Sequence, residues 1–294
     1  MAGRMARQPA LFVGHGGGPM FLLEGSGAFK DGDRNSPAAI SLRGVWDKLY
    51  GARGAFEPPR AVLVVSAHWE GSTPGKVEVL ERPGPNAPLL FDYYGFPPET
   101  YEYTYNAPQD RALTDRVLEL LRGAGIRAET NAGRKSFDHG VYIPLLLMRP
   151  QADVPILQVS LDASLDPEAH LALGRALAPL RDEGVLILGS GMTVHNMHER
   201  MPSDTAWAHE FQSWLDETVT NPNVADRQAM LRAWEKQGPH ARRAHPREEH
   251  LLPILVTQAA AGAEPAERLW DGWMARTFPL NAFLWGGNAE CESS

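Results

Sequence analysis

Cysteine is almost absent from this sequence of 294 residues, which contains only Cys291. A single cysteine cannot form an intramolecular disulfide, and it cannot build a zinc site of several thiolates. Any metal ion would therefore be held by histidine and carboxylate side chains. The near-absence of cysteine also agrees with a reducing compartment, so we expect a cytoplasmic protein.

The sequence also lacks an excess of positive charge and long hydrophobic segments. Its 28 Lys and Arg residues are outnumbered by 36 Asp and Glu residues, which gives a formal net charge of −8. Nucleic acid and an anionic membrane surface are therefore not expected as partners. No apolar run approaches the ~18 residues of a transmembrane helix, and the leader with Arg4 and Arg7 lacks the apolar core of a signal peptide. We expect a soluble protein that acts on a small molecule; composition does not distinguish a monomer from an oligomer.

Two common catalytic motifs are missing as well. His15-Gly-Gly-Gly18 resembles the oxyanion turn of some lipases and esterases, but no Gly-x-Ser-x-Gly occurs in the chain, and Gly189-Ser-Gly191 does not supply it. No Gly-Lys-Ser/Thr follows a glycine-rich turn, so a phosphate-binding P-loop is not expected.

The sequence does contain a regular alternation of predicted strands and helices. The run Ala61–Glu70 is continuously apolar until it ends in Ser66-Ala-His68-Trp, which is typical of a strand buried on both faces. The other patterns predict strands over 9–14, 126–130, 154–161 and 185–188, and helices over 36–51, 110–123, 141–148, from 166 and from 205. This order predicts one α/β domain over residues 1–294, with a mostly parallel central sheet and helices on both faces. A last apolar stretch, Phe278–Trp285, is predicted to be an edge strand.

The segment 71–108 is rich in proline, glycine and tyrosine and is predicted to be a long loop. Loops of this length inside a compact domain are usually functional. Its aromatic side chains suit either a wall for a planar ligand or a surface meander packed by its own rings. The sequence leaves both interpretations open.

Four histidines lie where predicted strands end or a helix begins. His15, His68 and His195 come at or just beyond the ends of buried strands, and His139 lies between a strand and a helix. The carboxyl edge of the strands is where open α/β sheets bind ligands. One such histidine alone would most often be a hydrogen-bonded structural residue. Four that converge without cysteine favour a site for iron, zinc or copper.

Six short motifs follow one another in register along the chain. They are Gly14-His15-Gly, Ser66-Ala-His68-Trp69, Phe96-Pro with Tyr101 and Tyr105-Asn-Ala-Pro108, Asp138-His139-Gly140, Gly189-Ser-Gly191 with Val194-His195-Asn196, and Glu249-His250-Leu-Leu-Pro253. In this order they resemble the 4,5-DOPA extradiol dioxygenase-like proteins, which belong to the class III extradiol ring-cleavage dioxygenases together with the catalytic subunit of protocatechuate 4,5-dioxygenase. The resemblance covers nearly the whole chain and implies a single α/β domain with a nonheme metal site that binds a catechol and O₂.

The resemblance also implies a set of metal ligands. His15 and His68 match the first two ligands, and His250 matches the third ligand of the DOPA-dioxygenase branch. The wider class has a carboxylate at the third position, so Glu249 or Glu248 remains open there.

Two further histidines receive roles from the same resemblance. His195 matches an acid/base histidine outside the ligand set, and His139 matches a substrate-side histidine.

Fe(2+) is expected for activity because it can pass an electron toward O₂, whereas Zn(2+), which the same site could hold, acts only as a Lewis acid. The alternatives are a zinc-binding protein of this fold that hydrolyses a bond or only binds a partner, and a structural domain with packed histidines.

The remaining basic side chains near these motifs are expected to be solvated. DOPA as the substrate is suggested only by the resemblance. Arg134 and Lys135 could contact a carboxylate of the substrate, but we expect both side chains to be solvated. Solvated helix or loop positions are also expected for four histidines, His170, His209, His240 and His245.

Overall fold

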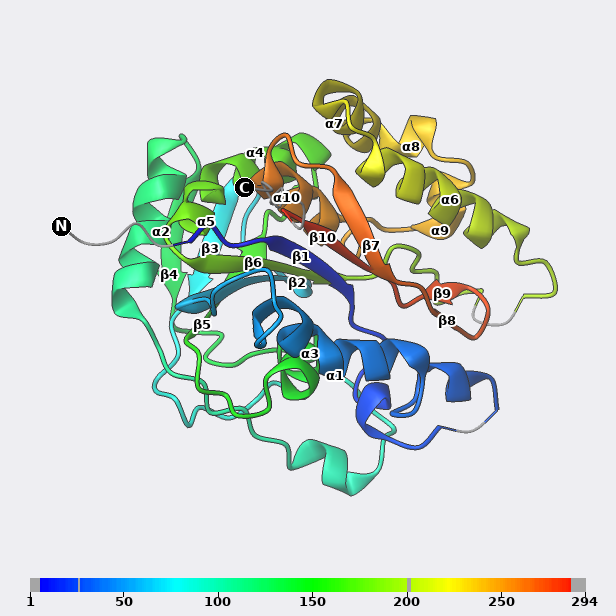
Figure 1. Cartoon of the computed structure of the whole chain (residues 1–294), viewed down its shortest axis with the longest axis horizontal. Coiled ribbons are helices and arrows are strands. Elements are labelled where there is room, and N and C mark those ends of the chain that lie inside the picture. Colours follow the sequence, from blue (N-terminus) through cyan, green and yellow to red (C-terminus); the bar gives the residue numbers. More distant parts are fainter. Residues whose placement is uncertain (1–5, 26, 200–201, 287–294) are drawn as a thin grey trace.

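The computed structural model describes residues 6–25, 27–199 and 202–286, so Cys291 and Arg4 lie outside the described residues. Its centre is an eight-stranded sheet with the strand order β4-β3-β5-β2-β6-β1-β10-β7 (Figure 1). The strands of this sheet are β1 (Ala10–Gly14), β2 (Ala61–Glu70), β3 (Lys76–Leu80), β4 (Arg127–Asn131), β5 (Ile156–Leu161), β6 (Val185–Gly191), β7 (Ala266–Trp270) and β10 (Ala282–Trp285). A separate two-stranded ribbon pairs β8 (Trp273–Met274) with β9 (Phe278–Pro279).

The middle of the sheet is parallel. β6 pairs in parallel with β1 and β2, and β2 pairs in parallel with β5. Toward the edges, β3 is antiparallel to β5, and β10 is antiparallel to both β1 and β7. This arrangement confirms the predicted α/β fold with a mostly parallel sheet, because the parallel strands carry the chain's central β-α-β units.

Helices cover both faces of the sheet and account for the unbroken apolar run in β2. Leu63 and Val65 belong to one buried core cluster, and Val62 and Val64 belong to the other. Two helices, α1 (Pro37–Tyr50) and α3 (His139–Met148), pack on the second cluster. The first cluster takes in α2 (Arg111–Gly123), α4 (Pro167–Leu177), α5 (Pro179–Asp182), α6 (Ala206–Thr220), α7 (Val224–Arg232), α8 (Trp234–Gln237), α9 (Ala241–Ala244) and α10 (Leu252–Ala261). Figure 1 shows the two groups on opposite sides of the sheet.

The residues before the first two predicted long helices cap them, as the sequence indicates. Ser36 precedes α1, and its hydroxyl accepts a hydrogen bond from the backbone N–H of Ala39 at 3.2 Å. Asp110 does the same for α2 by accepting from Leu113 N–H at 3.0 Å. Short 3-10 helices occupy the connections η1 (Met20–Leu22), η2 (Gly27–Gly32) and η3 (Pro98–Tyr101).

Two expectations from the sequence are wrong at the level of elements. The segment 71–108 is not all loop, because β3 lies inside it and joins the sheet beside β5. The apolar stretch Phe278–Trp285 is not an edge strand: only Ala282–Trp285 enters the sheet, between β1 and β7. Within the described part of the chain, no helix combines the length and apolarity needed to cross a membrane.

Candidate metal centre and active site

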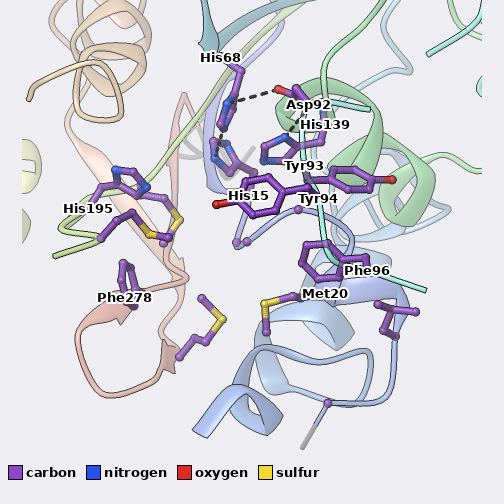
Figure 2. A pocket seen from close by; sticks show the side chains of 18 of the residues that line it. His15, Met20, His68, Asp92, Tyr93, Tyr94, Phe96, His139, His195 and Phe278 are labelled. Carbon is purple, nitrogen blue, oxygen red and sulfur yellow. Dashed lines mark hydrogen bonds and ion pairs between the residues drawn. The ribbon is translucent and has the colours of Figure 1, made fainter. Parts of the chain in front are cut away.

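Five histidines gather at the carboxyl edge of the central strands. His15 follows β1, His68 lies near the carboxyl end of β2, and His195 follows β6. His139 is the first residue of α3, and His250 lies two residues before α10. Figure 2 shows His15, His68 and His139 together at the closed end of a cavity, with His195 across from them. The structure therefore brings all five histidines of the motifs into one place.

Three of these rings form a triangle. The ring centroids of His15 and His68 are 4.8 Å apart, and the His250 ring lies 5.3 Å from His15 and 5.0 Å from His68. The Nε2 atoms of His15 and His68 are 3.1 Å apart. All three side chains are largely buried, so the triangle opens only into the cavity.

The hydrogen bonds of these rings fix which nitrogen carries the proton. The Ser190 hydroxyl donates to the carbonyl oxygen of Gly140, so Ser190 Oγ accepts from the Nδ1–H of His15 at 3.0 Å. The Nδ1 of His68 faces Asp92 Oδ2 at 3.4 Å. Both Nε2 atoms consequently keep their lone pairs and point at each other.

His250 follows the same pattern. Its Nδ1 donates to Glu249 Oε1 at 2.8 Å, which leaves its Nε2 unprotonated. An oxygen acceptor on the far ring nitrogen is the usual second contact of a metal-binding histidine, because it sets the tautomer and the ring direction. Each corner of the triangle has such an acceptor: a hydroxyl, an aspartate or a glutamate.

This donor set fits a transition-metal ion. Two metal–nitrogen bonds of ~2.0–2.1 Å at octahedral or tetrahedral angles place the two nitrogens about 2.8–3.4 Å apart. The observed 3.1 Å between His15 Nε2 and His68 Nε2 lies in that range. Two lone pairs at this distance repel unless a cation lies between them, and imidazole nitrogen suits iron and zinc.

Burial keeps these imidazoles neutral. Loss of solvent, reinforced by the positive charge of neighbouring histidines, holds the pKa of His15 and of His250 well below its usual range. The same cause lowers the pKa of His68 to about 3. Neutral imidazole is the form that binds a metal ion.

Asp92 connects two of the histidines and was not identified from the sequence. Its Oδ1 accepts from the Nδ1 and the backbone N–H of His139 at 2.8 and 3.0 Å, while its Oδ2 faces His68. Burial alone would raise the pKa of Asp92, but the hydrogen bonds from His139 and the nearby positive charges outweigh it and lower the pKa to about 2. The only signal in the sequence is a carboxylate within the aromatic run Phe91–Phe96.

His195 stands on the opposite side of the cavity, stacked on His250. The two ring centroids are 3.5 Å apart with an interplanar angle of 15°. The backbone N–H of His195 donates to Ala244 O at 3.0 Å, and its Nδ1 lies 3.8 Å from Glu249 Oε1. Burial and then the charge of His139 lower the pKa of His195 to about 4. It is therefore an unprotonated imidazole that faces the cavity at neutral pH.

Glu249 lies next to His250, at one corner of the histidine triangle. Besides His250 it contacts Arg247 Nη1 at 3.4 Å, and Arg247 in turn binds both oxygens of Glu70. Burial raises the pKa of Glu249. Glu248 turns away and accepts from Arg242 Nη1 at 2.6 Å.

A buried network supports the His68 and His139 segments. Asp138 accepts from Ser66 Oγ at 2.7 Å, from Arg134 Nη2 at 2.7 Å and from Gln158 Nε2 at 2.5 Å. Arg134 also donates to the His68 carbonyl at 3.2 Å. The expectation that Arg134 is solvated is therefore wrong, whereas Lys135 is exposed as expected.

Of the four histidines that were predicted to be solvated, two are exposed and two are buried. His209 and His240 are exposed, as predicted. His170 and His245 are fully buried, so the prediction of solvated positions is wrong for both. His170 Nδ1 pairs with Asp166 O at 2.8 Å, and His245 Nε2 pairs with the Thr193 carbonyl at 2.9 Å. Both are structural histidines outside the cavity.

The cavity next to the histidines has a volume of about 550 Å³. Tyr93, Tyr94 and Phe96 from the aromatic segment line one wall, together with Met20, and Phe278 lies opposite (Figure 2). This part of 71–108 therefore lines the cavity, as the wall interpretation requires. Other rings of the segment pack on one another, such as Phe91 on Tyr101 at 5.8 Å between centroids.

Comparison with known proteins places the chain in a family. The family described as "Catalytic LigB subunit of aromatic ring-opening dioxygenase" matches residues 44–284. A 4,5-DOPA dioxygenase extradiol from Beta vulgaris is 35% identical over 268 residues, which cover 89% of this chain and 91% of the relative. A 4,5-DOPA dioxygenase extradiol from Escherichia coli K12 is 33% identical over 285 residues, which cover 95% and 92%.

A solved structure agrees with these sequence matches. The crystal structure of an uncharacterized protein from Escherichia coli K12 superposes with a TM-score of 0.70 at 29% identity, covering 95% of this chain and 100% of that chain. The resemblance drawn from the motifs is confirmed. The chain belongs to the LigB family of aromatic ring-opening dioxygenases, and it is a ring-cleaving extradiol dioxygenase.

Proposed function

We propose that the chain cleaves a catechol ring beside its hydroxyl pair with O₂, and that Fe(2+) held by His15, His68 and His250 supports the reaction. The observation that carries this proposal is the triangle of three imidazoles, each with an oxygen atom beside its Nδ1, an arrangement that leaves Nε2 available to bind the ion. The names of the relatives from Beta vulgaris and Escherichia coli, 4,5-DOPA dioxygenase extradiol, support a catechol as substrate.

His250 is the third ligand in this proposal, and Glu249 is its support. Oε1 of Glu249 is engaged by the Nδ1–H of His250, on the side of the ring away from the triangle. Glu248 is paired with Arg242 and does not line the cavity. A neutral set of three imidazoles leaves the positive charge of the ion intact, which favours binding of a catecholate.

Among the described residues, His195, Glu249 and His250 form one group whose possible ligand atoms lie within 4.8 Å of one another, and His15, His68 and His139 form a second such group. The second group makes His139 an alternative third ligand. We assign it to the substrate instead, because Asp92 holds both its Nδ1 and its backbone N–H and fixes the ring beside the triangle. Its Nε2 is then an acceptor for a catechol hydroxyl.

His195 is the acid/base residue of the proposal. Its imidazole is neutral near pH 7 and faces the cavity, so it can take a proton from a catechol hydroxyl and return it to the ring-opened product. Positioned acid/base groups typically contribute about 10²–10⁴-fold to a rate. A bound Fe(2+) ion would supply the electron transfer to O₂ that zinc lacks.

Metal-free protein loaded anaerobically with Fe(2+) or with Zn(2+) tests this function. Each form receives a panel of catechols in air, DOPA included, and the product spectrum is recorded. We expect the iron form alone to give the yellow semialdehyde of extradiol cleavage. Stoichiometric iron without a new chromophore for any catechol would overturn the proposal and favour the zinc-binding alternative.

A further inference from the structure

The cavity extends well beyond the space that a catechol ring needs beside the histidines. An apolar cavity of about 150 Å³ holds a benzene ring. The cavity here measures about 550 Å³, within the range of sites for substituted ligands. The part away from the histidines therefore has room for a substituent on the ring.

The walls of this outer part are apolar. Thioether side chains come from η1, from the end of β6 and from β8, and aromatic rings come from the segment 91–97 and from β9. Figure 2 shows Phe278 on the His195 side and Phe96 and Met20 on the opposite side, with the space between them continuing to the histidines. The side chains that the argument uses are Met20, Met192, Met274, Tyr93, Phe96 and Phe278.

The two carboxylates that line the cavity are already engaged. Asp92 is held by His139 and faces His68. Glu24 pairs with Arg34 at 2.9 Å, and both side chains of this pair are exposed to solvent. The lining side chains of the described residues include neither lysine nor arginine. Arg134 lies behind His68 and is bound to Asp138.

We infer, on the basis of the proposed function, that the substrate is a catechol with an uncharged, apolar substituent that lies along this outer wall. A substituent carboxylate would lose its hydration among thioethers and rings, with two protein carboxylates nearby. An alkyl or aryl group instead gains contact with flexible methionine side chains, which adapt to irregular shapes. The free amino-acid group of DOPA fits this wall poorly.

A matched pair of catechols tests the inference on the iron-loaded wild-type protein. 4-Propylcatechol and 3-(3,4-dihydroxyphenyl)propanoate carry similar three-carbon substituents that end in a methyl group and a carboxylate. We expect kcat/KM to be about tenfold or more higher for 4-propylcatechol, with DOPA also below it. A higher kcat/KM for the carboxylate or for DOPA would overturn the inference.

Anaerobic calorimetric titration of the zinc-loaded protein with the same pair gives the ranking without turnover. If no catechol is cleaved, the proposed function fails, while the ranking of the two binding constants still decides the substituent class. Equal affinity for the two ligands would count against the apolar wall.

A charge placed in the wall gives a second test. Met20→Lys should raise kcat/KM for the carboxylate relative to 4-propylcatechol by about tenfold, because it supplies a cation where the substituent lies. Ile40→Lys is the matched control, since Ile40 is exposed on α1 and does not line the cavity. An identical shift in both variants, or none in Met20→Lys, would contradict the proposed position of the substituent.

Discussion

At the scale of single residues, the centre depends on oxygen acceptors that set the tautomers of its histidines. His15 relies on Ser190, His68 and His139 on Asp92, and His250 on Glu249. The sequence pattern could predict four of the five histidines of the centre, because each lies at a recognisable strand end or just before a helix, whereas His250 was identified only through the family resemblance. It could not predict Asp92 or Ser190 as their partners, because those contacts join residues 24, 47 and 175 positions apart along the chain.

The third metal ligand can be distinguished by two substitutions. His250→Ala removes a proposed ligand nitrogen and should lose stoichiometric metal, whereas Glu249→Gln should keep one metal ion with affinity reduced about 10–100-fold. Metal content after dialysis and a chelator competition titration measure both effects. Retained metal in His250→Ala together with complete loss in Glu249→Gln would instead make Glu249 the ligand.

Asp92→Asn should weaken both the metal site and the binding of catechol. The amide keeps one acceptor oxygen, but its NH₂ would face the N–H of either His139 or His68. We expect metal affinity about 10–100-fold lower and, at saturating zinc, weaker catechol binding by calorimetry. Asp153→Asn is the control, since Asp153 pairs with Arg149 on the surface. Unchanged values for both ligands would contradict a positioning role for Asp92.

At the scale of elements, the end of β6 connects the segments that carry His15 and His250. The Gly191 carbonyl accepts from His15 N–H at 3.1 Å, and Met192 N–H donates to the His250 carbonyl at 3.0 Å. The segment before α10 passes so close to β6 that a Cβ on Gly191 would lie 2.3 Å from the His250 carbonyl oxygen. The Gly-Ser-Gly motif thus joins β1 to the His250 segment.

Gly191→Ala should therefore displace His250. We expect unfolding free energy to fall by about 1–3 kcal/mol from overpacking and metal affinity to fall at least tenfold. Gly44→Ala is the matched control, because a Cβ there meets nothing within 4 Å on the exposed face of α1. It should raise stability by up to about 1 kcal/mol. Denaturant unfolding and metal titration measure both variants; wild-type metal affinity in Gly191→Ala would contradict this role.

Local sequence patterns predict some strands of this fold and do not predict others. β2 and β6 are recognisable because both their faces are buried, which requires uninterrupted apolar residues. The sequence pattern does not reveal β3, because this strand has only five residues and includes Glu78. The buried Glu78 side chain accepts a hydrogen bond from Asn131 of β4 at 2.6 Å. The position of β10 inside the sheet depends on pairing with β1 across almost the whole chain, which local periodicity does not record.

At the scale of the whole molecule, buried histidines make stability depend on pH. His245 is fully buried, its Nε2 pairs with the Thr193 carbonyl, and its Nδ1 has no hydrogen-bond partner. Burial, together with the charges of His195 and Arg242, lowers its pKa to about 3, below the ~6.5 of an unfolded chain. The unfolded chain therefore binds the proton first as pH falls. Stability is fully present above pH ~6.5 and is lost as pH falls toward 3.

His245→Gln should flatten this dependence. Between pH 6.5 and 4.5 the free energy of unfolding of metal-free wild-type protein should fall more steeply than that of the variant, by up to about 1.4 kcal/mol per pH unit. Urea unfolding at several pH values measures the two slopes. His240→Gln, an exposed position, should keep the wild-type slope. Equal slopes for wild type and His245→Gln would show that His245 is not held neutral by the fold.

Dioxygen uptake by the iron-loaded protein, followed together with the loss of a 4-alkylcatechol, decides whether the whole arrangement works as a ring-cleaving centre. We expect one O₂ consumed per catechol. An iron-loaded His195→Ala variant of equal metal content should be slower by about 10²–10⁴-fold. Full iron occupancy without O₂ uptake, or an unchanged rate in His195→Ala, would contradict the proposed chemistry of the five histidines.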